Sequence, residues 1–252
     1  FVRRLVITTI NNREYEFIIV GAGSAGCVLA NRLSEDSSNR ILLLEAGSRD
    51  NHWMISLPIG IGKLLPSGLF NWNYMSEPEP NADGKKIYHP RGKVLGGSSS
   101  INLMAYVRGN AADFNQWRQL GLASWGYDDV LPYFKRAENF QDGGDLYHGS
   151  QGPLRVSQPK LGDNVFNAFI EAGVAAGYPL TNDYNGANQE GFGQTQLTIH
   201  KGRRCSASTA YLHPIMQRSN LTVKTGAFVT SILFDGNRAI GIEYIKDGKL
   251  IT

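Results

Sequence analysis

The chain has 252 residues, of which 42% are hydrophobic and 19% charged, with a formal net charge of +3. This composition is typical of a folded globular protein and argues against a disordered chain. The small charge gives no reason to expect nucleic acid or an anionic membrane as a partner. The longest run of small and apolar residues, Ile18 to Ala30, is shorter than the roughly 20 residues needed for a transmembrane segment.

The two cysteines, Cys27 and Cys205, are too few for a disulfide framework. We therefore expect a cytoplasmic protein, with membrane-peripheral or organellar association left open because the basic opening of the chain is compatible with a transit peptide. The histidines show no metal-ligand spacing, and each is interpreted as a hydrogen-bonding surface or loop residue, so no metal is expected.

The start of the chain predicts a strand, a glycine turn, a helix and a second strand. Residues 16–20, apolar except for Glu16, stop at Gly21, residues 24–34 carry apolar side chains at helical spacing, and residues 41–44 form a second buried run. Such a unit joins two parallel strands through a right-handed crossover. The expected fold class is therefore α/β, with a Rossmann-like parallel sheet.

The rest of the chain is predicted to leave this sheet and return to it. Residues 48–90 are rich in proline, glycine and aromatic residues without a long helical period, and we expect an excursion that packs over a ligand. Helical patterns then follow at 112–120, at 127–139 with Pro132 in the first turn, and at 164–176. Strands are predicted at 221–224, 230–234 and 239–244, with a hairpin turn at 246–249.

Gly21-Ala22-Gly23-Ser24-Ala25-Gly26 has the G-x-G-x-x-G spacing of a dinucleotide-binding turn. Gly21 allows the tight bend, Gly23 leaves room for a pyrophosphate, and Gly26 lets the helix lie close to the strand. Glu45 follows about 20 residues later, where a carboxylate can accept the hydroxyls of an adenosine ribose. That charge would repel a 2′-phosphate, so NADP is disfavoured while NAD and FAD both stay open.

A second glycine stretch occupies residues 92–115 and reads GKVLGGSSSINLMAYVRGNAADFN. Paired glycines followed by serines can form a concave row of N–H and hydroxyl donors for an electron-rich ligand. A serine-capped helix start would explain Ser98 to Ser100, but it would leave Gly96 and Gly97 without a role. The two glycine stretches together favour a flavin dinucleotide.

The chain resembles the glucose-methanol-choline (GMC) family of FAD-dependent oxidoreductases. The motifs that carry the resemblance are GAGSAG at 21–26, LLLEAG at 42–47, HPRGKVLGGSSSIN at 89–102, YVRG at 106–109, RRCSASTAYLHP at 203–214 and the β segment 227–244. The resemblance implies a first part of the FAD-binding domain at 15–153, part of a substrate-binding or cap domain at 154–204, and an incomplete return to the FAD-binding domain at 205–252.

The resemblance also implies which residues hold FAD. They are Gly21, Gly23, Ser24, Ala25, Gly26, Glu45 and Ala46 around the first turn, Val94, Gly97, Ser98, Asn102, Leu103, Met104 and Ala105 in the second stretch, and Val229 through its backbone at the adenine. Some relatives have a histidine covalently attached to the flavin where this chain has Ile101. We therefore expect non-covalently bound FAD.

The implied activity is oxidation of a CH–OH group by hydride transfer to flavin N5. The SSSIN and YVRGN forms are most similar to the choline dehydrogenase branch, which implies a primary alcohol such as choline, with oxygen, a quinone or another acceptor taking the electrons. The family's catalytic histidine and its partner are expected beyond Thr252, so the catalytic residues are unknown.

Two alternatives stay open. The chain could be a truncated, non-catalytic FAD-binding fragment with poor solubility and weak FAD retention, or a member similar to the family's light-driven fatty acid decarboxylase.

Overall fold

The computed structural model describes residues 14–159 and 163–252, so the basic opening considered as a transit peptide lies outside the described residues. The chain forms two compact units, one ending at Leu103 and resuming at Ser206–Thr252, the other comprising Met104–Cys205. The divisions expected from the sequence lie after residues 153 and 204. Residues 104–153 belong to the second unit because Ala105 bridges to Leu197 and the Tyr106 N–H donates to the Gln196 carbonyl at 2.9 Å. The roles expected for the two domains stay predictions.

A three-stranded parallel sheet forms the centre of the first unit, in the order β1 (Phe17–Val20), β2 (Ile41–Leu44) and β9 (Leu221–Lys224). All residues of β2, the middle strand, are buried. An uninterrupted apolar run is what a parallel strand covered on both faces requires. The predicted α/β architecture and the bounds of β2 and β9 are therefore confirmed.

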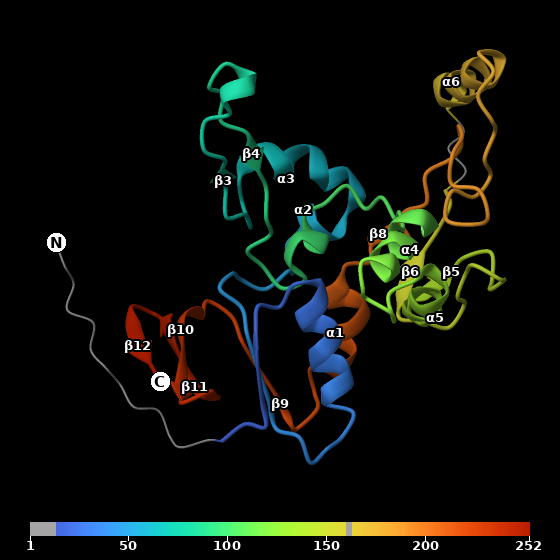
Figure 1. The fold of residues 1–252 in the computed structure, drawn as a ribbon. Helices are drawn as coiled ribbons and strands as arrows, with labels where there is room; N and C mark the ends of the chain where they lie inside the picture. The colour runs from blue at the N-terminus through green and yellow to red at the C-terminus, as the bar shows by residue number, and fades with distance from the viewer. Residues whose placement is uncertain (1–13, 160–162) are drawn as a thin grey trace. The chain divides into compact units, whose positions relative to one another are not determined.

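Helix α1 (Ser24–Leu33) follows the glycine turn and packs against β1 and β2 (Figure 1). Its buried face consists mainly of small residues, including Gly26, Cys27 and Ala30. Small side chains let the helix axis approach the sheet closely. Burial raises the pKa of Cys27 to about 12, so this thiol stays protonated and unreactive.

The excursion of residues 48–90 contains short elements that the sequence pattern does not reveal. They are α2 (Trp53–Ser56), α3 (Ile61–Ser67), β3 (Tyr74–Met75) and β4 (Tyr88–His89). A hydrophobic cluster of Met54, Ile55, Leu64, Val94 and Ile101 joins the two helices to the second glycine stretch. The excursion is thus fixed by a core of its own, although α2 and α3 are too short to produce a helical period.

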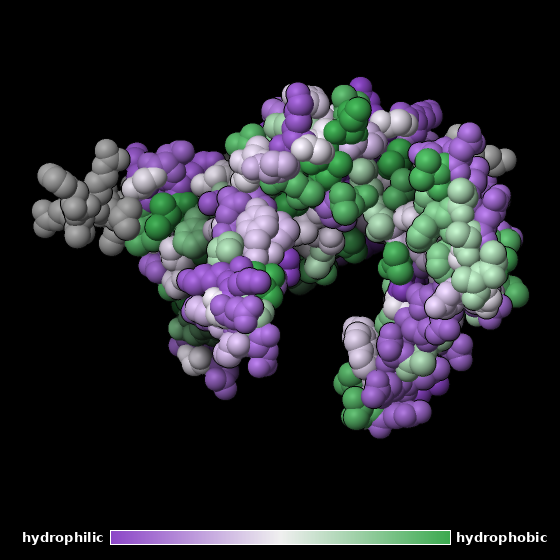
Figure 2. Space-filling view, turned by 90° about the horizontal axis from the view of Figure 1, so that it is seen from above, coloured by the Kyte–Doolittle hydropathy of each residue, from purple (hydrophilic) through white to green (hydrophobic). Residues whose placement is uncertain are grey.

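The first unit ends in an antiparallel sheet of β10 (Phe228–Asp235), β11 (Arg238–Lys246) and β12 (Lys249–Ile251). The predicted hairpin turn is confirmed, because Asp247 and Gly248 have φ of 51° and 75°, as a type I′ turn requires. Phe228, Ile232 and Phe234 alternate along β10 and are exposed. Figure 2 likewise shows apolar side chains interspersed with polar ones on the molecular surface.

The second unit contains α4 (Ala111–Gln119), α5 (Tyr127–Ala137), α6 (Asn164–Ala175), the parallel pair β5 (Glu138–Phe140) and β6 (Leu154–Val156), and the hairpin β7 (Ile199–His200) with β8 (Arg203–Arg204). The predicted position of Pro132 is wrong, since this proline lies in the second turn of α5. The Asp129 carboxylate accepts the Gly126 N–H at 2.9 Å and so starts the helix at Tyr127. No helix within residues 14–159 and 163–252 has the length and hydropathy to cross a membrane.

Candidate dinucleotide site

The first glycine turn combines a crowded position with an open one. Gly21 has φ of 90° and donates its N–H to the Leu44 carbonyl at 2.7 Å. A Cβ added at Gly26 would lie 1.9 Å from the Gly21 carbonyl oxygen, whereas a Cβ at Gly23 would meet nothing within 4 Å. Gly26 is therefore needed for helix–strand packing, and the space beside Gly23 is available to a ligand.

The second glycine stretch lies directly against the first. The Gly96 N–H donates to the Ala22 carbonyl at 2.7 Å, and a Cβ at Gly97 would lie 2.8 Å from the Gly23 Cα atom. Gly97 also has φ of 54°, which favours glycine. Two motifs far apart in the sequence thus form one backbone-lined surface in the first unit.

The serines after Gly97 bind their own loop. Ser100 Oγ donates to the Leu95 carbonyl at 2.7 Å, and Ser99 Oγ donates to Gly96 while accepting the Ala207 N–H. Ser98 Oγ accepts the Gly92 N–H at 3.0 Å, although Ser98 itself is exposed. The predicted row of hydroxyl donors is therefore largely occupied in holding the loop's shape, and the exposed Ser98 is the serine best placed to meet a ligand.

Glu45 connects the turn to the end of β2. Its buried carboxylate accepts the Ala22 N–H and the Gly47 N–H, each at 2.8 Å. Burial raises the pKa of Glu45, and these two hydrogen bonds oppose the rise. Each carboxylate oxygen retains a lone pair that can accept a further hydrogen bond, such as one from a ribose hydroxyl.

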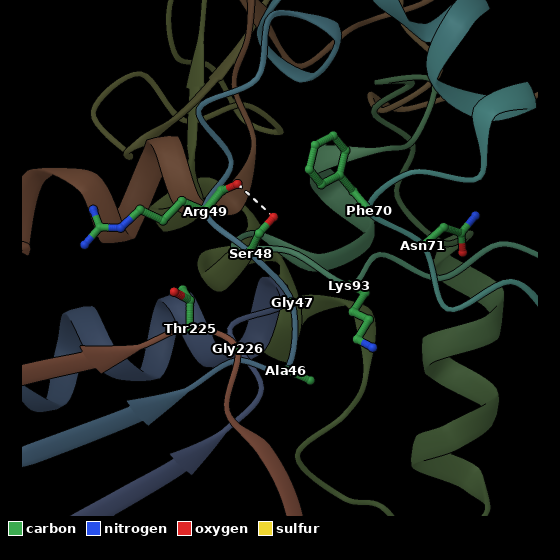
Figure 3. A pocket seen from close by; sticks show the side chains of 9 residues that line it. All are labelled: Ala46, Gly47, Ser48, Arg49, Phe70, Asn71, Lys93, Thr225 and Gly226. Carbon is green, nitrogen blue, oxygen red and sulfur yellow. Dashed lines mark hydrogen bonds between the residues drawn. The ribbon is translucent and has the colours of Figure 1, made fainter. Parts of the chain in front are cut away.

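A pocket of about 480 Å³ opens beyond the carboxyl ends of β2 and β9 (Figure 3). It is lined by Ala46, Gly47, Ser48, Arg49, Phe70, Asn71, Lys93, Thr225 and Gly226. The Arg49 and Lys93 side chains point away from one another, and Lys93 Nζ lies 4.4 Å from the ring centroid of Trp72. Open α/β sheets bind ligands at this carboxyl edge.

The other predicted contact residues differ in accessibility. Ser24 and Ala25 are exposed at the start of α1, where the first N–H groups have no intrahelical acceptor. Val94 has no exposed surface and belongs to the core cluster with Ile101, and Val229 is half-buried against the core beneath β10. Their contacts with a flavin stay predictions.

Residues 102–105 include the boundary between the two units, which lies after Leu103. Asn102 and Leu103 end the first segment of the first unit and are exposed. Met104 opens the second unit, is 5% exposed and has φ of 65°, and Ala105 after it is exposed. A positive φ at a residue other than glycine is a strained conformation that the surrounding structure must maintain.

Asp50 and Ser208, which are buried, form a cluster with the exposed His213 that the sequence does not reveal. His213 Nε2 lies 3.0 Å from Asp50 Oδ1, and Ser208 Oγ donates to Asp50 Oδ2. The hydrogen bond to Asp50 raises the pKa of His213. Burial alone would raise the pKa of Asp50, but the hydrogen bonds from His213 and Ser208 outweigh burial and lower it. Asp50 and Ser208 both contact His213 Nε2, so the carboxylate does not orient the ring from the opposite nitrogen as it does in a nucleophilic triad. These hydrogen bonds hold the segment that contains Ser208 and His213 against residue 50.

The sequence profile of the GMC oxidoreductase family matches residues 15–252. The chain belongs to the GMC oxidoreductase family. It is 46% identical over 250 residues to the mitochondrial choline dehydrogenase of Mus musculus, covering 96% of this chain and 42% of that protein. This GMC chain therefore spans about two fifths of that relative's length.

Solved structures of two oxidoreductases have a similar fold. A pyridoxine 4-oxidase from Mesorbium loti has a TM-score of 0.84 at 36% identity, with 92% of this chain and 46% of the other covered. An FAD-dependent oxidoreductase from Chaetomium thermophilum also has a TM-score of 0.84, at 28% identity, with 92% and 42% covered. Among the described residues of the GMC chain, no group of three or more His, Cys, Asp or Glu side chains could hold a metal ion.

Proposed function

We propose that the chain holds the FAD of an alcohol oxidoreductase similar to choline dehydrogenase. The observation that carries the proposal is the open space beside Gly23, bordered by the start of α1 and by Gly97. A pyrophosphate fits such a place because backbone N–H groups can reach it and no Cβ excludes it. The identity to a choline dehydrogenase favours choline or a similar alcohol as the substrate of the whole protein.

In this proposal the protein's residues position the cofactor. Ser24 and Ala25 donate backbone N–H groups to the phosphates, and Glu45 accepts the ribose hydroxyls. The pocket that includes Ala46 and Lys93 lies beside Glu45 and takes the adenosine end. Bound FAD would supply hydride acceptance at N5. The base that takes the alcohol proton and the electron acceptor are left unassigned.

Gly23→Ala tests the cofactor site without disturbing the fold. The Gly23 backbone has φ of −73°, which alanine adopts, and the added Cβ meets no protein atom within 4 Å. We expect at least a tenfold loss of FAD affinity, about 1.4 kcal/mol, with an unchanged free energy of unfolding, because the methyl group occupies the ligand's space. Titration of the chain with FAD, followed by flavin fluorescence, measures the effect.

Gly62→Ala is the matched control, since its Cβ also meets nothing within 4 Å and Gly62 belongs to α3 and not to the glycine turn. Equal FAD affinity of the two variants would contradict the proposed site. Choline-dependent dye reduction by the FAD-loaded chain, with a full-length choline dehydrogenase as positive control, separates an active enzyme from a fragment that only holds the cofactor.

We also propose that the FAD is bound without a covalent link. Ile101 is 4% exposed, packs in the core cluster with Met54 and Val94, and carries no nucleophile. Acid precipitation of the FAD-loaded chain should therefore release all of the flavin into the supernatant, as measured by its absorbance. Flavin that stays with the precipitated protein after washing would refute non-covalent binding.

A further inference from the structure

His148 is enclosed in the second unit between two carboxylates; it is a hydrogen-bonding loop residue, as expected, but it is buried. Its side chain is 1% exposed, and its ring stacks on Phe140 with centroids 4.1 Å apart. Nδ1 lies 3.0 Å from Glu138 Oε2, and Nε2 lies 3.0 Å from Asp183 Oδ2. Because an ionised carboxylate only accepts hydrogen bonds, this arrangement requires a proton on both ring nitrogens.

The charges around this imidazolium balance. Glu138 is fully buried, and its Oε2 atom also accepts a hydrogen bond from Arg108 Nη2 at 2.8 Å. Arg108 and His148 supply two positive charges, and Glu138 and Asp183 supply two negative ones. Arg108, Glu138 and His148 are buried, and buried charges are stable only when each keeps its partner.

The same network binds the backbone of residues 106 and 108. Asp183 Oδ1 accepts hydrogen bonds from Gln196 Nε2 and from the Asn185 N–H, at 2.8 and 3.0 Å. Asn185 Oδ1 accepts the Arg108 N–H at 2.8 Å, and its Nδ2 donates to the Tyr106 carbonyl at 3.0 Å. The hydrogen bonds therefore close a ring from His148 through Asp183 and Asn185 to Arg108 and back through Glu138.

Tyr106, whose carbonyl is bound by Asn185 of this ring, stands two residues from the strained backbone of Met104. The Met104 carbonyl is fixed as well, since it accepts the Thr198 N–H at 2.9 Å. Strain of this kind persists only where the surroundings over-determine the conformation. The hydrogen bonds from Asn185 to the backbone of residues 106 and 108 supply that constraint on the C-terminal side of Met104.

We propose that protonated His148 is a positioning residue that holds segment 104–108, and with it the strained Met104, in place. The proposal deepens the proposed function, on which its link to the flavin rests, because Met104 and Ala105 are predicted flavin contacts. The placement of Met104 by His148 itself needs no bound cofactor.

The protonation of His148 depends on the groups that face it. Burial lowers the pKa of His148, but Glu138 on β5 and Asp183 on the 178–198 loop outweigh burial and raise it. Asp145 accepts the His148 backbone N–H, Lys135 on α5 binds the Asp145 carbonyl, and Arg108 lies beyond Glu138. Because the folded-state pKa is raised, the protonated form and its stabilisation are complete below the ordinary histidine pKa and are lost as pH rises through the raised value.

The test is NMR of the cofactor-free chain labelled at methionine methyl groups and histidine rings. We expect the methyl signal of Met104 to shift with rising pH with the same midpoint as the His148 ring. His148→Gln should displace the Met104 signal and abolish its titration. His200→Gln, at an exposed histidine of the same unit, is the control and should leave Met104 unchanged.

If His148→Gln does not fold, Asp183→Asn is the second test. Asp183 is 34% exposed, so the variant is expected to fold, and the change removes one of the two negative charges beside His148. It should lower the midpoints of His148 and Met104 together. A Met104 signal that is indifferent to His148 titration, or midpoints that separate in Asp183→Asn, would overturn the proposal. Because no FAD is present, failure of FAD binding leaves this result unaffected.

Discussion

Gly26→Ala should lower the free energy of unfolding of the chain by about 3 kcal/mol. Its Cβ would lie 1.9 Å from the Gly21 carbonyl oxygen and 3.4 Å from Ile19 Cγ2. A backbone oxygen cannot move aside as a flexible side chain can, so either α1 must shift along the sheet or the turn must open. Urea unfolding followed by circular dichroism measures the loss.

The comparison with Gly23→Ala makes this prediction specific. The two glycines belong to the same motif, but only Gly26 is surrounded by protein atoms. We expect Gly26→Ala to lose stability and FAD binding together, while Gly23→Ala loses FAD binding alone. A Gly26→Ala variant as stable as the unaltered chain would contradict the packing role derived for this glycine.

Glu138→Gln should be the most damaging single change in the second unit, with a loss of about 3–5 kcal/mol in the free energy of unfolding. The carboxylate is fully buried and binds Arg108, His148 and the Gly149 N–H. Glutamine keeps the shape but removes the charge, which leaves a buried guanidinium uncompensated. The NH₂ group of glutamine would also face Arg108, His148 or the Gly149 N–H, which are themselves hydrogen-bond donors.

Asp83→Asn is the control for the loss of one carboxylate charge. Asp83 pairs with Lys85 at 3.9 Å, and their side chains are 93% and 74% exposed, so no measurable change in stability is expected. Both variants should be compared at the same pH and salt concentration by denaturant unfolding. Equal midpoints for Glu138→Gln and Asp83→Asn would show that the buried network does not stabilise the fold.

The elements that sequence predicts well are those whose signal is local. The apolar run of β2 and the turn at Asp247 and Gly248 depend on residues within a few positions. The G-x-G-x-x-G spacing likewise assigns separate roles to Gly23 and Gly26; the crowding around Gly26 agrees with its packing role, and the pyrophosphate contact of Gly23 stays a prediction.

What the sequence could not provide are contacts between distant residues. Nothing near Asp50 indicates that it binds Ser208 and His213, and the pattern around His148 resembles an ordinary loop although Glu138 and Asp183 enclose it. Side chains of these types occur both on surfaces and in buried networks, and only the fold decides between the two. The hydroxyls of Ser99 and Ser100 could not be assigned to the loop itself for the same reason.

The pairing of β2 with β9 governs the order in which the protein can fold. Ile41 lies opposite Leu221, so the middle strand must wait until residues 221–224 have left the ribosome before its second neighbour arrives. Contacts of such high sequence separation slow folding, because the entropy of closing a long loop is lost before the pairing is gained. The apolar edge of β2 is thereby left uncovered on the nascent chain, and it is the segment where a chaperone would be needed during synthesis.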